Sequence, residues 1–568
     1  MGFSNLSIRN RIMSIALAAA TVTMLLPSNL LAQEKLQKGG GSATMSDGTK
    51  PVVVVTIGSI SKLMQDVNYV TSIAGQPQAG GLFQVMAGTV TQGIDTSQPI
   101  GILVPMVDGL PEPIAVIPTP NVKTVLKRLE AQTGPVDELD DGTLVIAVGA
   151  NTVYIRQSGD WAVAARTRDV LALAPADPTA LFTGMGNAYD LAFRVKMQQI
   201  PEDTRNMLIG QMRQGFEQAM AQNPAGSPEM AENTIEQMER MINESDEINF
   251  GINIDEANKQ IAINFAYAAL AGTELADIYN GQKSIPSKFA SVINPAAAAY
   301  FHSAASVSPA AVELTTKSLE STFEAIRGAL TTEGLPADQA EEINEMIGRV
   351  GDLYIKSIAE GKMDMGAQLI ANEQNFKIML GGFVSDGNEA AQIAKDLAAK
   401  VDEAAAGKEN APRFKFDQGT YNGVTMHVIE ADVPESEDEA RRIFGEVLRI
   451  HIGTGPKSLY VAAGKESESM LKKFIDAGAN DAGATDRPVG QMRFTLLPIL
   501  KFAQTIDDNE VISTMINSLE SAPDPGEVQI VSEVIPNGTD VKIAIGEGLI
   551  KAIGEAVTAA QGNPPGQF

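Results

Sequence analysis

The chain has 568 residues, no cysteine, and 70 acidic against 43 basic side chains, which gives a formal charge of −27. Without thiols it can form no disulfide, cysteine nucleophile or thiolate metal site. Its negative charge repels phosphate backbones and anionic membrane surfaces, and its basic residues form no run longer than a pair, so nucleic-acid binding is not expected.

The first 32 residues follow the plan of a secretory signal peptide. Arg9 and Arg11 precede an apolar segment from Ile12 to Leu26, and the sequence then runs to Leu30-Leu31-Ala32, with cleavage expected after Ala32. The alternative is a retained anchor, but the apolar segment is shorter than the roughly 20 residues that span a bilayer. Because no cysteine follows, a lipoprotein anchor is excluded. We therefore expect a periplasmic or secreted protein with no stable membrane span after cleavage.

Residues 33–50 contain Gly-Gly-Gly-Ser and almost no apolar side chains, which is typical of a flexible linker. The folded part is expected to begin near Pro51. The Gly- and Pro-rich end, 561–568, is predicted to be a disordered tail.

Between these ends, strand and helix patterns recur in the same order and predict an α+β protein with mainly antiparallel strands and packed helices. Each half begins with a strand, at 52–57 or 297–302, and continues with helices, a pair of strands, and a helix that starts at Asn121 or Asn388. This order favours two similar lobes, 51–290 and 291–560, made by internal duplication. A single large α+β domain is the alternative. Two similar lobes usually create a groove in which ligands sit.

The closing segments of the two halves agree best. We expect hairpins at 247–268 and 527–548, the second with Asn537-Gly538 in its turn, followed by helices at 273–280 and 549–560.

Ser59-Ile-Ser-Lys62 lies where a strand meets a helix, the context of the serine nucleophile in β-lactamases and penicillin-binding proteins. The supporting motifs of that mechanism are missing, and the same spacing recurs from Ser469 to Lys472. We therefore interpret Ser59 as a helix N-terminus. Triad chemistry needs a histidine, and His302, His427 and His451 are interpreted as packed or edge residues rather than bases.

Other motifs are each incomplete, and no catalytic, cofactor-binding or metal-binding residue is assigned. Asp137–Gly142 lacks oxygen ligands that a calcium loop requires, and the acidic residues 435–439 suit a helix N-terminus. Gly453–Ser458 lacks a glycine of the phosphate loop, and Gly546-Glu-Gly548 lacks the third glycine of a dinucleotide site. Five methionines lie at predicted helical positions, where thioether groups could bind Cu(I), but we interpret them as side chains that fill gaps on an apolar helix face: Met207, Met212, Met220, Met238 and Met241.

The signal peptide, Gly/Ser spacer, cysteine-free acidic composition and repeated strand-strand-helix units resemble the uncharacterised exported proteins of planctomycete bacteria. This resemblance implies no activity, cofactor or site residue. We expect a non-catalytic envelope or secreted protein with a binding or structural role, whose partner is a protein, an envelope component or a hydrophobic ligand. The expected contact surfaces are the groove between the lobes and the apolar faces of the strands. The alternative is a carboxylate-dependent hydrolase of a wall or surface polymer, with two acidic residues roughly 5 to 10 Å apart in a polar cleft. An apolar groove would instead favour a hydrophobic carrier. A third hypothesis is a scaffold that assembles through sheet edges.

Overall fold

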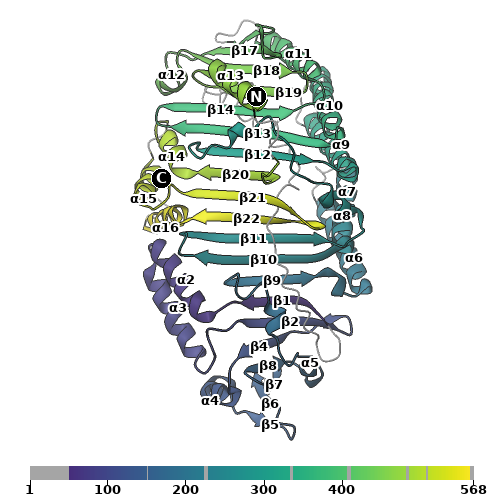
Figure 1. Cartoon of the computed structure of the whole chain (residues 1–568), viewed down its shortest axis with the longest axis vertical. Helices are drawn as coiled ribbons and strands as arrows, with labels where there is room; N and C mark the ends of the chain where they lie inside the picture. Colours follow the sequence, from purple (N-terminus) through teal and green to yellow (C-terminus); the bar gives the residue numbers. More distant parts are fainter. Residues whose placement is uncertain are drawn as a thin grey trace.

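The computed structural model describes residues 50–149, 151–222, 228–332, 337–405, 411–480, 485–506 and 509–562. The signal peptide, most of the linker and most of the tail that the sequence predicts lie outside these ranges. The predicted α+β class with antiparallel strands is confirmed, because every strand pairing in the described part of the chain is antiparallel. Figure 1 shows the strands stacked as the rungs of one long sheet, with helices along both sides.

The sheet is continuous through the molecule, and its order is given by the hydrogen-bonded neighbours. One half, from the outer end inward, consists of β5 (Asp137–Glu138), β6 (Leu144–Val148), β7 (Asn151–Ser158), β8 (Trp161–Ala165), β4 (Ile114–Pro118), β2 (Ile100–Val107), β1 (Pro51–Ile57), β9 (Leu191–Lys196), β10 (Ser245–Asp255) and β11 (Gln260–Ala269). A short strand, β3 (Leu110–Pro111), pairs with β2.

The other half continues outward from the partner of β11. It consists of β22 (Gly538–Gly546), β21 (Glu527–Ile535), β20 (Gly490–Thr495), β12 (Ala299–Ser306), β13 (Lys362–Asn372), β14 (Asn375–Phe383), β19 (Ser458–Ala463), β18 (Val447–Gly455) and β17 (Val424–Asp432), with β16 (Thr420–Tyr421) and β15 (Arg413–Lys415) both on β17. The β11–β22 pair joins the halves, from Gln260 opposite Gly546 to Ala268 opposite Gly538. The sheet therefore crosses the lobe boundary predicted near residue 290 without a break.

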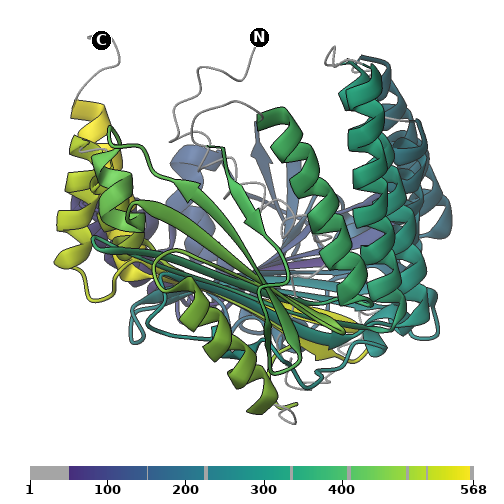
Figure 2. The same ribbon diagram turned by 90° about the horizontal axis from the view of Figure 1, so that it is seen from above.

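Most helices form two banks at opposite ends of the strands. One bank holds α2 (Ile60–Ile73), α3 (Pro77–Val90), α14 (Leu496–Gln504), α15 (Glu510–Glu520) and α16 (Glu547–Gly562); the other holds α6 (Glu202–Gln222), α7 (Pro228–Glu244), α8 (Glu274–Asn280), α9 (Pro309–Thr332), α10 (Ala337–Ala359) and α11 (Gly387–Ala405). Seen along the sheet in Figure 2, the tall helices of both banks rise from the same side, and α13 (Ser467–Asn480) lies on the other. Three further helices are α4 (Val122–Thr133), α5 (Arg168–Ala172) and α12 (Asp438–Phe444).

Helix starts follow local capping chemistry, with one correction. Asn121 caps α4 by accepting the Thr124 N–H at 3.1 Å, as predicted. The predicted cap at Asn388 is wrong, because α11 begins one residue earlier and the Asp386 carboxylate accepts the N–H groups of Asn388 and Glu389 at 2.8 and 3.3 Å. A carboxylate is the stronger acceptor at the positive end of a helix.

The two predicted closing hairpins are confirmed as β10–β11 and β21–β22. The turn of the second hairpin is one residue earlier than the Asn537-Gly538 pair, because Ile535 pairs with Gly538 and the loop consists of Pro536 and Asn537. Asn537 has φ 59°, which suits the second position of a turn that begins with proline.

One face of the sheet, which we call the packed face, carries the two largest hydrophobic cores. Phe182 packs against it in the first half and Phe289 in the second, and both are nearly inaccessible to solvent. Glycines make room for these rings: a Cβ on Gly101 would stand 2.2 Å from Phe182, and one on Gly381 would stand 2.3 Å from Phe289. The core therefore lies on the side of the sheet away from the tall helices.

Candidate binding surface

The opposite face of the sheet, which we call the open face, carries unbroken rows of apolar side chains. Because side chains alternate along a strand, residues directly opposite each other on neighbouring strands share a face. One row crosses the eleven strands from β9 to β18 through Leu191, Ile252, Ile263, Ile543, Ile530, Met492, Phe301, Ala367, Leu380, Val461 and Ile452. At roughly 4.8 Å between strands, this row is about 48 Å long.

The open face is incompletely covered where β2, β9 and β11 cross it. Phe193 is 36% exposed, Phe265 is 37%, Leu191 is 40% and Ile102 is 42%, although all four lie on strands with neighbours on both sides. Phe193 and Phe265 flank Phe250 in one row, and the rings of Phe193 and Phe250 stack with centroids 5.2 Å apart. The surface is therefore both aromatic and accessible.

On the packed face of the same central strands, polar side chains are buried. Asn249 and Asn264 are each 8% exposed. The Tyr189 hydroxyl donates to Asn264 Oδ1 at 2.6 Å, and Asn264 Nδ2 donates to Asp540, which is 1% exposed. Burial raises the pKa of Asp540 to about 7, aided by the nearby Glu533 and opposed by the hydrogen bond from Asn264. The central strands thus bury amides and a carboxyl group while they expose phenylalanine, the reverse of the usual distribution.

Ser59 is a helix cap, as the sequence analysis interpreted it. Its Oγ accepts the Lys62 N–H at 3.2 Å and donates to the Thr96 carbonyl at 3.0 Å. Lys62 Nζ instead reaches the buried carboxylates of Asp66, at 2.7 Å, and Asp190.

This ion-pair cluster perturbs the ionisation of its members. Burial raises the pKa of Asp66 to about 6, and Asp190 adds to the effect while Lys62 opposes it. Burial lowers the pKa of Lys62, but the hydrogen bonds to Asp190 and Asp66 outweigh that effect and the net change is upward. Lys62 therefore stays protonated and is unsuited to act as the base for Ser59.

The histidines are packed, and each binds a hydroxyl group. His302, which is fully buried, lies 2.9 Å from Ser287 Oγ, and that hydroxyl donates to Asp364 at 2.6 Å. The serine stands between the histidine and the carboxylate, whereas a catalytic triad has the histidine in the middle. His427 contacts Thr454 and His451 contacts Ser467, at 2.9 and 2.8 Å. Burial lowers the pKa of both.

The glycine motifs and the predicted calcium-like turn have structural roles. Gly453–Ser458 forms the β18–β19 turn, and the N–H of Gly548, at the start of α16, is taken by Asp524 at 2.7 Å, where a dinucleotide site would hold phosphate. Asp141 accepts the Thr143 N–H at 3.0 Å and pairs with Arg168 at 2.6 Å.

Metal-binding residues do not gather in the part of the chain that the structure describes. There, no three His, Cys, Asp or Glu side chains lie close enough to hold a metal ion. Met212 and Met238 line a small apolar gap between α6 and α7 beside Ile209 and Ile235. The Met220 side chain lies outside the described residues.

The apolar strand faces were expected as a contact surface, but the sequence did not show which face is accessible or over which strands. The signal for the open face is the alternation of apolar residues in Ile248–Ile254 and Ile261–Tyr267. Alternation shows that a strand has one apolar face, but not whether that face is covered.

In comparisons with known proteins, no family matches this chain, and neither a curated protein nor a solved structure matches it. Within the described ranges, no helix has the length and apolarity needed to cross a bilayer.

Proposed function

We propose that this is a non-catalytic exported binding protein whose ligand is an extended apolar molecule, with acyl chains of an envelope lipid as the chemical class, bound on the open face. One observation carries the proposal: Leu191, Phe193 and Phe265 are 36 to 40% exposed in the interior of a wide sheet. Contiguous exposed apolar surface of this kind is uncommon in soluble monomers and marks binding sites.

An extended ligand fits the shape of the open face. The rows run across the strands for about 48 Å, and the helix banks in Figure 2 border the face on both sides. Each methylene group that leaves water contributes about 0.8 kcal/mol. A chain with about ten methylene groups in contact therefore gains about 8 kcal/mol before its loss of freedom is counted.

A fluorescent fatty acid titrated into the purified protein tests the proposal. We expect saturable binding, and Phe193→Asp or Phe265→Asp should weaken it at least tenfold, because a charge would enter the apolar contact. The matched control is Val85→Asp, where an apolar side chain that is 69% exposed belongs to helix α3 and not to the sheet. Equal affinity of all three variants, at unchanged melting temperature, would rule the surface out. Mass spectrometry of an organic extract would identify the natural ligand.

Export remains a proposal that rests on the N-terminal sequence. Sequencing the N-terminus of protein recovered from the periplasm or medium should give Gln33 as the first residue. A protein that keeps residues 1–32 would be anchored or unexported.

We also infer that the halves arose by duplication. The strand order supports this. Outward from the seam between β11 and β22, the first half runs β11, β10, β9, β1, β2, β4, and the second runs β22, β21, β20, β12, β13, β14. In each half the last three strands in the sequence come first and are followed by strands from its beginning. A test is whether residues 291–562, expressed alone, fold cooperatively. Failure to fold would favour a single domain.

The second candidate is a carboxylate-dependent hydrolase. The observation in its favour is the raised pKa of Asp66 beside Asp190, an arrangement that can hold a general acid. Asp66→Asn should then abolish release of reducing ends from wall polysaccharide. Under the leading proposal it leaves fatty-acid binding unchanged.

A further inference from the structure

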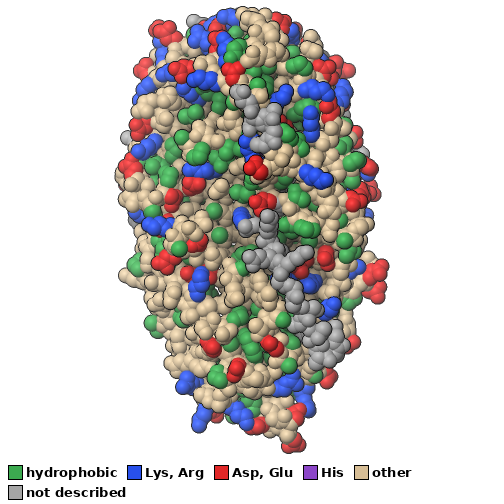
Figure 3. All heavy atoms as spheres, viewed as in Figure 1, with side chains coloured by type: hydrophobic (Ala, Val, Ile, Leu, Met, Phe, Trp, Pro, Cys, Tyr) green, Lys and Arg blue, Asp and Glu red, His purple; other side chains and the backbone are tan. Residues whose placement is uncertain are grey.

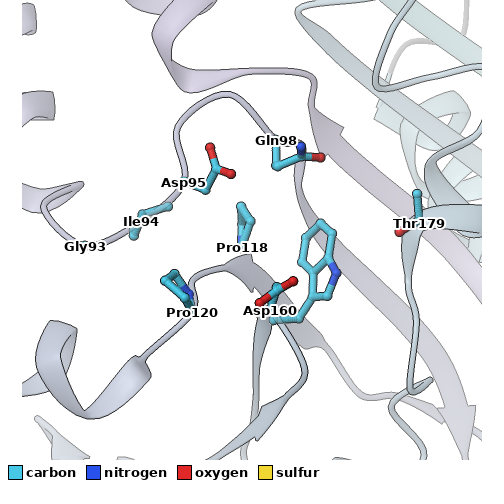
Figure 4. Close-up of a pocket in the computed structure, with 9 residues that line it drawn as sticks. Gly93, Ile94, Asp95, Gln98, Pro118, Pro120, Asp160 and Thr179 are labelled. Carbon is cyan, nitrogen blue, oxygen red and sulfur yellow. The ribbon is translucent and has the colours of Figure 1, made fainter.

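A hollow of about 580 Å³ lies away from the open face, near the outer end of the first half of the sheet. Trp161 is among the residues that line it. Figure 4 shows the side chains of Asp95, Gln98, Asp160 and Thr179, which belong to the same lining. The volume is within the usual range for small-molecule sites, about 300 to 1,000 Å³.

The hollow is built on fixed backbone. The Asp95 N–H donates to the Pro118 carbonyl, and the Thr119 N–H donates to the Asp160 carbonyl, both at 2.8 Å. Both acidic residues are thereby tied to the end of β4. These backbone hydrogen bonds help to fix the positions of the two carboxylates.

The indole is held equally firmly. Trp161 begins β8 opposite Pro118, and its ring lies 6.1 Å from that of Phe182, which is 3% exposed. Trp161 is only partly buried, so the ring is supported from behind and accessible from the hollow. It is the only tryptophan in the chain.

The charges that line the hollow are both negative. Asp95 Oδ1 accepts from the N–H and hydroxyl of Ser97 at 3.0 and 2.6 Å, and Oδ2 makes neither contact. A basic group lies at the rim, where Arg128 Nη1 is 3.9 Å from the place that a Cβ on Gly93 would occupy. With one positive charge at the rim and two negative charges in the lining, the local field attracts cations and repels anions.

We propose that this hollow binds an organic cation that carries a quaternary or protonated amine, with the ammonium group over the indole face of Trp161 and near Asp95 and Asp160. Tryptophan is the best aromatic partner for such a cation. The carboxylates supply the counter-charge that the indole lacks. This site is independent of ligand binding on the open face, and either proposal can fail without the other.

Because Trp161 is the only tryptophan, its fluorescence reports directly on the hollow. Titration of the full-length protein with tetramethylammonium and with choline should give a saturable change. The neutral isostere of choline, 3,3-dimethylbutan-1-ol, should bind at least tenfold more weakly. Equal binding of the isostere, binding of a neutral sugar such as cellobiose in preference to choline, or no saturable change would overturn the proposal.

Variants sharpen the test, because the acidic residues and Arg128 are predicted to change the affinity for a cation in opposite directions. Asp95→Asn and Asp160→Asn, made as separate variants, should each weaken tetramethylammonium binding several-fold. The first keeps the Oδ1 acceptor for Ser97. Arg128→Gln should instead tighten the binding. Asp203→Asn, an exposed carboxylate on α6, makes the same change in net charge and should have no effect. Unaltered affinity in Asp95→Asn and Asp160→Asn would show that the carboxylates do not bind the cation.

Discussion

Asp540→Asn should stabilise the protein at neutral and alkaline pH and lose this advantage in acid. Asp540 lies at the seam between the two halves, on the packed face of β22, and it is 1% exposed. Asparagine keeps an oxygen that can accept from Asn264 Nδ2, so the substitution removes the charge with little change of shape.

The size of the effect follows from the raised pKa. The folded-state pKa is about 7, whereas an unfolded Asp titrates near 3.9, so the folded chain binds the proton more tightly. Stability then falls as pH rises between these two values and levels off above the higher one. The difference is about 4 kcal/mol once Asp540 is fully ionised, and about 1.5 kcal/mol of it is present at pH 5.

The assay is thermal unfolding of parent and variant from pH 5 to pH 8, together with denaturant unfolding at the two ends. The free-energy gap between them should widen by about 2 to 3 kcal/mol across this range. Asp246→Asn, an exposed carboxylate on β10, should give a gap that does not vary with pH. A constant gap for Asp540→Asn as well would refute the claim that this carboxyl titrates near neutrality.

Three further substitutions test the packing. Lys62→Met leaves the buried carboxylates of Asp66 and Asp190 without a counter-charge and should cost about 3 kcal/mol at pH 8, with a smaller loss in urea unfolding below pH 6, where Asp66 takes up a proton. Phe289→Ala removes a fully buried ring that packs on Tyr460 and Phe474 and should cost about 3 to 5 kcal/mol by the same assay. Gly387→Ala would place a Cβ 1.7 Å from the Gly455 carbonyl oxygen, so circular dichroism should show a clearly lowered melting temperature; an unchanged value would mean that the two chain segments separate freely.

Local signals in the sequence predicted much of the fold. The closing hairpins and the cap at Asn121 follow from alternation and from a side-chain oxygen at a helix start, and the structure confirms them. The cap at Asp386 was missed because Asp386 and Asn388, two residues apart, can both cap a helix, and only the backbone conformation decides between them.

Long-range arrangement was beyond the sequence. Nothing in Gln260–Ala269 reveals that its free edge pairs with Gly538–Gly546, more than 250 residues away, because antiparallel pairing leaves no local mark on either strand. The exposure of Phe193 depends in the same way on helices from distant segments standing at the strand ends. The candidate surface therefore appears only in three dimensions.

The seam between β11 and β22 also limits how the protein can move. Nine residue pairs cross it without a bulge, from Gln260 to Ala268, so the halves cannot swing about a flexible hinge as two-lobed binding proteins do. A ligand would have to settle on the open face between the helix banks, over a rigid floor. Its residence time would then depend on how fast it slides off the strands, and not on the opening of a clamp.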